Sequence, residues 1–395
     1  MNPFLSLGMM PLTGSYPKLK DEPVEQYPLN LSFCQECFLV QICEKVPVEW
    51  LFARGYAYHS SYSTTMLEHA RRYANKLVNR LGLDHGSLVI EIGSNDGYML
   101  KNFLDRGINV LGIDPAREPA SVAHGHGIET LTCFFDRHCA RRLKASGNEA
   151  DVIIANNVLA HAEDPTGFLE GALLLLKPNG LVVIEVPYLR ELVDRMEFDT
   201  IYHEHRCYFS LTALVHLFER AGLSLFDVEQ HEIHGGSLRL FACRPGVYAV
   251  TDAVRNLLET ERHSGMHSVE YYREFSRRVQ HARESIHSFL GGLYRQGASI
   301  AAYGAAAKGV ILLNACAIGS DILDFVVDRN PGKQDRYMPG TGIPVLRPEA
   351  ILQAMPDYVI VLPWNLTDEI LEQECVYSNR GGRFIVPLPT PRIIS

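Results

Sequence analysis

The densest group of side chains that can move a proton is Tyr202-His203-Glu204-His205. An imidazole has an unperturbed pKa of about 6.5, so a histidine beside a glutamate can serve as a general base near neutral pH. A tyrosine hydroxyl can donate a hydrogen bond to a developing oxyanion. Two other interpretations stay open. His203 and His205 could be metal ligands on one strand face, although a third ligand is not evident, or the group could be a polar loop without chemistry.

Residues 88–114 have the layout of a nucleotide-cofactor site. Glu91 lies near the end of an apolar run, Gly93 and Gly97 follow it, and Asp114 closes the next apolar run. Glycines let the polar part of a cofactor approach the backbone at a helix N-terminus, and an acid at the tip of the next strand accepts ribose hydroxyls. The spacing Glu-x-Gly-x-x-x-Gly lacks the third glycine of a dinucleotide fingerprint. It resembles motif I of class I methyltransferases, which bind S-adenosylmethionine (SAM), although the glycines could also form a plain strand-to-helix turn.

Two more residues could border the same site. His161 follows a strand expected at 151–156, so it lies at a carboxyl-end tip, where it could also be a helix N-terminal histidine without chemistry. Tyr56, in the segment Tyr-Ala-Tyr-His-Ser-Ser, could cap the cofactor pocket or simply anchor the N-terminal segment.

Two glycine-rich segments could contact a phosphate or a sugar. Gly304-Ala-Ala-Ala-Lys308-Gly309 is not a Walker A loop, but its backbone N–H groups and Lys308 could cradle a diphosphate. His234-Gly-Gly-Ser-Leu-Arg239 combines flexible glycines with an arginine. Each segment also fits an ordinary structure, a tight strand–helix turn in the first case and a hairpin in the second.

Cys34 and Cys37 have the spacing of two zinc ligands. A closed structural zinc site needs four ligands, and the only later thiol nearby is Cys43. The chain therefore offers a half site, and a bound zinc ion is not the favoured interpretation.

The elements that must position these residues alternate between strand and helix. We expect strands at 87–92, 109–113, 151–156 and 181–186, and helices at 97–106, 118–125, 136–145 and 166–176. Such alternation predicts a parallel sheet covered on both faces, with ligands at the carboxyl ends of its strands. A second alternating unit begins at Ala298, with strands expected at 299–303, 323–327, 343–346 and 357–362.

The fold class is therefore α/β, and 395 residues suffice for two or three domains. The expected parts are a small irregular N-terminal module at 1–60, a doubly wound unit at 61–245, a helical connector at 246–296 and a second doubly wound unit at 297–395.

Composition narrows the class of partner. The net charge of -9 gives no basic footprint for nucleic acid, and polar, Gly or Pro residues interrupt every long apolar run, so no membrane span is expected. No signal peptide is indicated, and nine scattered cysteines argue against a disulfide framework, so we expect a cytoplasmic protein. The oligomeric state stays open.

Over nearly the whole chain, these segments resemble SAM-dependent C-methyltransferases that act on nucleotide-linked keto-deoxysugars. The resemblance rests on the segments 32–41, 56–61, 91–97, 156–161, 202–210, 235–239 and 303–309. It implies an N-terminal zinc-binding module, a central SAM domain and a C-terminal Rossmann-like domain that helps hold the nucleotide-sugar. Such proteins usually carry an earlier cysteine pair, which this sequence lacks. We therefore expect either a shortened start or a lost zinc site.

The resemblance also implies roles for single residues. His205 matches the general base. The family's residues that line the reacting sugar correspond to Tyr202, Glu204, His161 and Tyr56. The family's SAM contacts correspond to Glu91, Gly93, Asn95, Gly97, Asp114 and Asn156. The family's other substrate contacts correspond to Gly236, Ser237, Arg239, Tyr303 and Lys308.

The implied reaction forms a carbon nucleophile. His205, oriented by Glu204, would remove a proton next to the ketone, and the enolate would attack the methyl group of SAM. Other readings of the sequence are an O- or N-methyltransferase for a small metabolite, an NAD-dependent dehydrogenase, and a non-catalytic nucleotide-binding protein.

Overall fold

Runs of β-branched residues build the central sheet. The structure, a computed structural model, describes residues 1–44, 46, 60–62 and 64–394. Its central sheet has the strand order β10-β11-β8-β7-β4-β5-β6, and β11 alone runs antiparallel to its neighbours. Its strands are β4 (Leu88–Ile92), β5 (Asn109–Ile113), β6 (Thr130–Leu131), β7 (Ala150–Asn156), β8 (Leu176–Pro187), β10 (Ser224–His231) and β11 (Ser237–Cys243). The doubly wound α/β unit expected from the sequence is confirmed.

The order of connection creates a switch point in this sheet. From β4 the chain builds β5 and β6 on one side, and it then returns to build β7 and β8 on the other. A crevice therefore opens between the carboxyl ends of β4 and β7, where open α/β sheets bind ligands.

Helices cover both faces of the central sheet. They are α2 (Thr64–Leu81), α3 (Lys101–Leu104), α4 (Arg117–Gly125), α5 (Arg137–Ala145), α6 (Pro165–Leu175), α7 (Leu189–Asp194), α8 (Leu211–Arg220) and α9 (Asp252–His263). Side-chain oxygens of Asp136, Asp164 and Ser210 cap α5, α6 and α8 by accepting backbone N–H groups in the first turn. The helix expected at 97–106 is shorter, because turns on both sides of Gly97, whose φ is positive, occupy residues 95–100.

The N-terminal residues form a sheet rather than the irregular module that the sequence predicts. Strands β1 (Asn2–Pro11), β2 (Gln26–Phe33), β3 (Val40–Ile42) and β9 (Cys207–Tyr208) pair in that order, all antiparallel. Leu5 and Leu7 of β1 are buried in one cluster with Tyr272 and Phe275 of α10 (Val269–Arg295). Because this apolar surface comes from residues far along the chain, local sequence does not reveal the strands.

The second doubly wound sheet has the order β14-β15-β13-β12-β16-β17-β18. Its strands are β12 (Ile300–Tyr303), β13 (Val326–Val327), β14 (Arg336–Tyr337), β15 (Pro344–Leu346), β16 (Tyr358–Val361), β17 (Arg383–Val386) and β18 (Arg392–Ile394). The associated helices are α11 (Ala307–Ala315), α12 (Glu349–Ala354), α13 (Thr367–Gln373) and α14 (Cys375–Asn379). Its switch point lies between β12 and β16.

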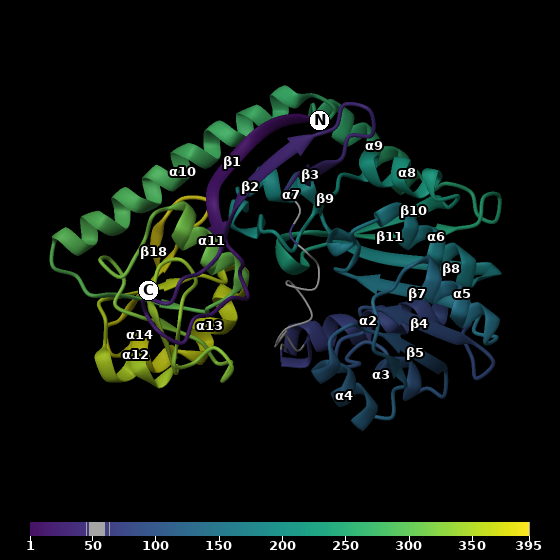
Figure 1. Ribbon diagram of the computed structural model, residues 1–395, viewed down its shortest axis with the longest axis horizontal. Coiled ribbons are helices and arrows are strands. Elements are labelled where there is room, and N and C mark those ends of the chain that lie inside the picture. The colour runs from purple at the N-terminus through teal and green to yellow at the C-terminus, as the bar shows by residue number, and fades with distance from the viewer. Residues whose placement is uncertain (45, 47–59, 63, 395) are drawn as a thin grey trace.

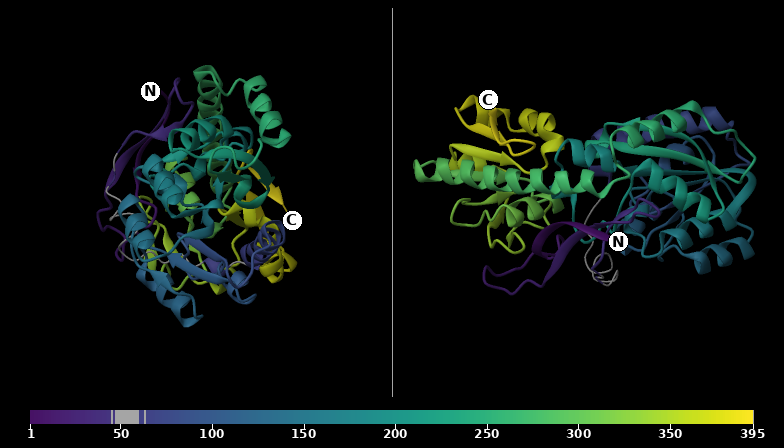
Figure 2. Two further views of the ribbon diagram at one scale, coloured as in Figure 1. Left: turned by 90° about the vertical axis from the view of Figure 1, so that its right-hand side faces the viewer. Right: turned by 90° about the horizontal axis from the view of Figure 1, so that it is seen from above.

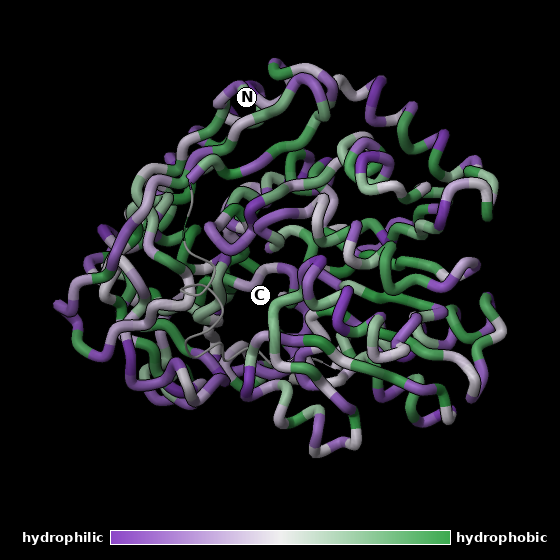
Figure 3. The backbone as a smooth tube through the Cα atoms, turned by 45° about the vertical axis from the view of Figure 1, so that its right-hand side comes forward, coloured by the Kyte–Doolittle hydropathy of each residue, from purple (hydrophilic) through white to green (hydrophobic). Residues whose placement is uncertain are grey.

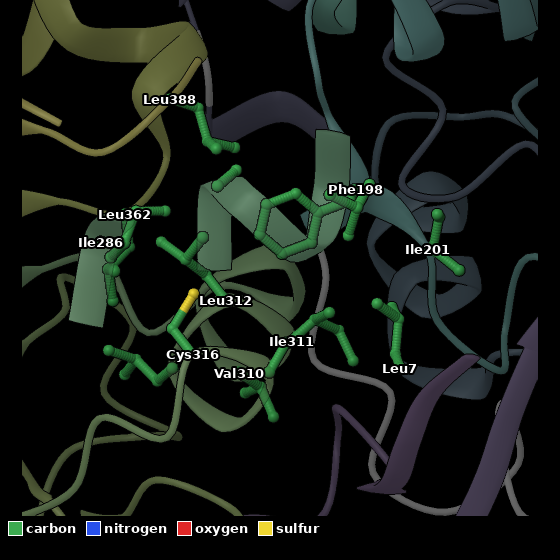
Figure 4. Close-up of a cluster of buried hydrophobic side chains, with 14 of the residues drawn as sticks. Leu7, Phe198, Ile201, Ile286, Val310, Ile311, Leu312, Cys316, Leu362 and Leu388 are labelled. Carbon is green, nitrogen blue, oxygen red and sulfur yellow. The ribbon is translucent and has the colours of Figure 1, made fainter. Parts of the chain in front are cut away.

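The two doubly wound units form two lobes, and α10 lies along the outside of the second one (Figures 1 and 2). Apolar segments run through the sheets of both lobes (Figure 3). A single buried cluster joins the parts, since Leu7 of β1, Phe198 of the first lobe, Ile286 of α10 and Ile311 of α11 pack together (Figure 4). Among the described residues, no helix is both long and apolar enough to cross a membrane.

Candidate functional site

A cleft of about 1750 Å³ lies where the N-terminal part, the central α/β unit and the second α/β unit meet. Its walls come from the carboxyl ends of β4, β5 and β7, from residues 12–17 of the N-terminal part, from the segment 200–208, and from the start of α11. One cavity therefore borders both switch points.

Gly93, Asn95, Asp114 and Asn156 border the cleft at the switch point of the central sheet. Gly93 has a φ of +71°, and a Cβ there would lie 2.4 Å from Cγ2 of Val158, so only glycine fits without displacing its neighbour. The Asp114 carboxylate accepts the N–H groups of Asn95 and Ala116, each at 2.8 Å. These bonds lower the pKa of Asp114, but burial is the larger effect and raises it.

Two of the expected SAM contacts support this crevice from behind rather than border it. Glu91 is fully buried, and burial together with Asp114 and Asp96 raises its pKa well above the usual value. Gly97 has a φ of +80°, and a Cβ there would lie 2.5 Å from Cδ1 of Ile128, so its lack of a side chain serves packing.

Tyr202 and His205 of the Tyr-His-Glu-His segment meet His161, a third expected residue, in the cleft. Nε2 of His205 lies 3.0 Å from the Tyr202 hydroxyl, and Nδ1 lies 3.3 Å from the carbonyl oxygen of Thr200. The ring of His161 lies 4.8 Å from that of His205 between centroids. A carbonyl oxygen only accepts, so the Thr200 bond requires the hydrogen of a neutral His205 on Nδ1 and places the basic lone pair on Nε2.

His161 is held in the same way. Its Nδ1 is hydrogen-bonded to the carbonyl oxygen of Glu204, and burial lowers its pKa, which favours the neutral ring at neutral pH. Tyr56, also expected here, lies outside the described residues.

Glu204 does not orient His205, contrary to the sequence-based expectation. Its carboxylate accepts a hydrogen bond from the hydroxyl of Thr13 at 2.7 Å, and burial raises its pKa. Residues 203 and 204 form a turn, so the Glu204 carboxylate meets Thr13 of the N-terminal part while the His205 ring meets Tyr202. Both Glu204 and His205 border the cleft. His203 is bonded to the carbonyl oxygen of Pro28, so it does not pair with His205 as a metal ligand.

Of the expected contacts at 236–239, only Gly236 borders the cleft. Ser237 donates its hydroxyl hydrogen to the carbonyl oxygen of Ile233 at 3.0 Å. Arg239 is buried, pairs with Glu185 at 2.9 Å, and lies over the Tyr73 ring at 3.5 Å from its centroid. Arg239 is therefore a structural residue, because α2 covers this face of β11 and supplies Tyr73.

In the second lobe, Lys308 borders the cleft and Tyr303 does not. Nζ of Lys308 donates a hydrogen bond to Asn365 at 2.8 Å and lies 4.4 Å from the ring centroid of Trp364. Tyr303 packs against the opposite face of the second sheet and donates its hydroxyl hydrogen to Gln373 at 3.3 Å.

Three residues of this wall were not expected from the sequence, namely Tyr16, Lys333 and Arg336. The Tyr16 hydroxyl and the Lys333 ammonium both donate to the carbonyl oxygen of Ala305, at 2.6 and 2.7 Å, and Arg336 donates to the carbonyl of Tyr16 at 3.2 Å. Asp328 follows β13 as Asp114 follows β5, and this signal could have assigned the following loop to the cleft.

The basic groups of this wall are partly buried. Burial lowers the pKa of both Lys308 and Lys333, while nearby carboxylates oppose the shift. An anionic ligand would favour their charged forms, so the wall suits a phosphate better than a neutral group.

The described residues do not complete a zinc site. Cys34 and Cys37 lie on one tight turn, in which Phe38 donates its N–H to the carbonyl oxygen of Cys34 at 2.9 Å. No group of three or more histidine, cysteine or acidic side chains that could hold a metal ion occurs in the described ranges. Two thiols do not meet the four-ligand requirement of structural zinc, so the described residues by themselves do not fit a structural zinc ion.

Three family models match the chain in sequence. Residues 1–52 match "Putative zinc binding domain", residues 66–228 match "Methyltransferase domain", and residues 232–389 match "C-methyltransferase C-terminal domain".

One relative of known activity matches nearly the whole chain, whereas other relatives and solved structures match only part of it. C-methyltransferase NovU from Streptomyces niveus is 37% identical over 394 residues, which cover 99% of this chain and 94% of that protein. The ubiquinone biosynthesis O-methyltransferase of Aeromonas salmonicida is 25% identical over 36% of this chain and 65% of its own. Magnesium protoporphyrin IX methyltransferase from Synechocystis, solved with SAH, covers 45% of this chain and 83% of its own at 17% identity and a TM-score of 0.36.

Proposed function

Because this chain belongs to the C-methyltransferase family, we propose that it transfers the methyl group of SAM to the carbon next to the ketone of a nucleotide-diphosphate 4-keto-deoxysugar. SAM-dependent transfer of a methyl group to carbon follows from the family. The sugar substrate and the role of His205 are the proposed part. The observation that carries them is that His205, the SAM-type crevice and a basic wall all border one cleft.

Gly93, Asn95, Asp114 and Asn156 are the residues that would hold SAM. Asp114 keeps lone pairs that suit ribose hydroxyls, and Gly93 lets a ligand approach the backbone. When bound there, SAM supplies a methyl group that its sulfonium already makes electrophilic.

The chain must therefore create a carbon nucleophile. A neutral His205 presents the lone pair of Nε2 beside the Tyr202 hydroxyl, so it can take a proton from the carbon next to a ketone. The Tyr202 hydroxyl lies 3.0 Å from Nε2 and can then bond to the enolate oxygen. Loss of one such oxyanion donor typically costs about 3 kcal/mol of barrier.

The nucleotide diphosphate has a matching wall. Lys308, Lys333 and Arg336 border the cleft on the second lobe. Charge-assisted hydrogen bonds from these groups would fix the diphosphate and leave the sugar to reach toward His205.

The experiment combines methyl-¹³C SAM with a panel of TDP- and UDP-linked 4-keto-deoxysugars. We expect a product whose ¹³C methyl shift is that of a carbon-bound methyl group. A methyl group on oxygen or nitrogen would contradict the proposed acceptor. His205→Gln should lower kcat by about 10²- to 10⁴-fold and leave the Kd for SAM near that of the wild type.

A further inference from the structure

The carbonyl group that sets the tautomer of His205 belongs to a tight turn. Thr200, whose carbonyl oxygen lies 3.3 Å from His205 Nδ1, ends the short helix η3 (Phe198–Thr200). Thr200 bonds back to the carbonyl oxygen of Glu197 through both its N–H (3.0 Å) and its hydroxyl (2.7 Å). Residues 197–200 therefore form one hydrogen-bonded unit, and whatever holds any part of it also directs the Thr200 carbonyl.

The second lobe holds this unit. The Asp199 side chain is buried, and its Oδ2 accepts a hydrogen bond from the indole N–H of Trp364 at 2.7 Å. Trp364 begins the short helix η5 (Trp364–Leu366), separated by two residues from the end of β16 at the switch point of the second sheet. On either side of Asp199, Phe198 and Ile201 belong to the buried cluster that includes Ile311 of α11 (Figure 4).

The same indole ring meets the phosphate wall proposed above. Nζ of Lys308 lies 4.4 Å from the centroid of the Trp364 ring and donates a hydrogen bond to the neighbouring Asn365. Trp364 thus contacts Lys308 of the cleft and supports Asp199.

We propose that Trp364 is a positioning residue for His205. Its indole N–H fixes Asp199, the 197–200 turn carries that restraint to the Thr200 carbonyl, and this carbonyl keeps the hydrogen of neutral His205 on Nδ1. The second lobe thereby orients the base in addition to bordering the substrate. The catalytic consequence rests on the proposed role of His205, whereas the structural link does not.

Apolar packing alone does not explain this arrangement. Phe198 and Ile201 would anchor the turn in the core without any partner for Asp199, and a buried carboxylate is costly unless it is hydrogen-bonded. Trp364 supplies that bond, and Lys308 adds a favourable charge. A hydrogen bond is directional, so the indole N–H restrains the orientation of the turn. Apolar packing is not directional and restrains this orientation less.

The decisive variant is Trp364→Phe, which keeps an aromatic ring under Lys308 and removes the N–H donor. ¹⁵N-histidine NMR of the free protein, with His205 assigned by the loss of its signals in His205→Gln, reports the tautomer without any substrate. We expect the wild type to show the Nδ1–H tautomer and Trp364→Phe to show a mixture with the Nε2–H tautomer. Unchanged His205 shifts in Trp364→Phe would overturn the proposal.

Kinetics give a second readout in the complete enzyme. Loss of a partner that orients a metal-bound imidazole typically costs about 10- to 100-fold, and we expect an effect of the same order for His205. We expect Trp364→Phe to lower kcat by that factor with KM values for SAM and nucleotide-sugar near those of the wild type. A fall in kcat with unchanged NMR signals would also contradict the proposal, because the effect would then bypass His205.

Two more variants separate positioning from general stability. Asp199→Asn keeps an oxygen that can accept the indole N–H, so it should retain more of the Nδ1–H tautomer than Asp199→Ala does. Tyr377→Phe removes a buried hydrogen bond to the carbonyl of Pro356 in the same lobe, at 2.8 Å, and should lower only Tm. If Tyr377→Phe shifts the His205 signals equally, the link through Trp364 is not specific and the proposal fails.

Discussion

In each of the two doubly wound sheets, a glycine follows the first strand and packs against a residue that follows the neighbouring strand. A Cβ on Gly93 would lie 2.4 Å from Val158 Cγ2, and a Cβ on Gly304 would lie 2.5 Å from Pro363 Cδ. Both glycines have a positive φ, +71° and +91°. The two sheets thus use the same local device to bring a backbone turn close to the next strand at the switch point.

The side chains around the two turns differ in charge. Asp114 after β5 and Asp328 after β13 each accept the backbone N–H two residues later, at 2.8 Å. In the central sheet Asp114 also accepts the N–H of Asn95, whereas in the second sheet Lys333 lies 3.8 Å from Asp328. One crevice therefore offers acceptors that suit hydroxyl groups, and the other offers cations that suit the diphosphate proposed above. The loops rather than the topology make this difference.

Alanine at the two glycines should give the largest effects. A left-handed backbone costs an alanine about 1–2 kcal/mol, and the crowded Cβ adds about 1–3 kcal/mol. We expect Gly93→Ala to weaken SAM binding and Gly304→Ala to weaken binding of TDP-glucose or UDP-glucose, measured by titration calorimetry.

Matched controls isolate the crowding. Gly107 (φ +71°) and Gly297 (φ +86°) have the same backbone strain but nothing within 4 Å of an added Cβ. Gly107→Ala and Gly297→Ala should therefore lower Tm without changing either affinity. Loss of both ligands in either switch-point variant would mean that the two crevices do not act separately.

Substitutions of charged residues test the different ligand preferences of the two crevices, and we expect smaller effects than from the glycine variants. A charge-assisted hydrogen bond is worth about 1.5–3 kcal/mol, so Lys333→Ala should raise the Kd for TDP-glucose about 10- to 100-fold and leave that for SAM unchanged. Asp114→Asn should do the reverse, because an amide accepts fewer hydrogen bonds than a carboxylate. Lys177→Ala, which removes an ion pair with Asp151 on the surface, is the matched control.

The pH dependence of binding should differ in sign between the crevices. Burial raises the pKa of Asp114, so its charge is lost at a higher pH than usual as the solution is acidified, and SAM affinity should fall on the acid side. Burial lowers the pKa of Lys333, so its charge is lost earlier as pH rises, and affinity for TDP-glucose should fall on the alkaline side. Titration calorimetry across a range of pH checks both changes in affinity. Asp114→Asn should remove only the fall in SAM affinity at acid pH.

Local signals in the sequence predicted the strands that end at the two switch points and the glycines that follow them. The apolar runs before Gly93 and Gly304 end at polar or glycine residues, and a parallel sheet follows from their alternation with helices. Asp114 is on the cleft because the same rule places strand tips together.

Partners that arrive from distant segments were not predictable. Arg239 turned inward because α2 brings Tyr73 over its strand, and Glu204 meets Thr13 from the N-terminal part. Sequence spacing records neither contact. The strands β1 and β2 were missed for the same reason, because their apolar faces have a partner only once α10 has packed against them.

The smallest expected effect concerns the face of the second sheet that points away from the cleft. Tyr303→Phe removes a hydroxyl that donates to Gln373 at 3.3 Å, so it should cost about 0.5–1.5 kcal/mol of stability and leave the Kd for TDP-glucose unchanged. Tyr16→Phe is the matched variant, because the Tyr16 hydroxyl bonds to Ala305 at the cleft and helps shape the phosphate wall. It should weaken TDP-glucose binding. If both variants weaken TDP-glucose binding equally, Tyr303 contributes to the substrate site as the sequence suggested. The placement of Tyr303 on the face away from the cleft would then be contradicted.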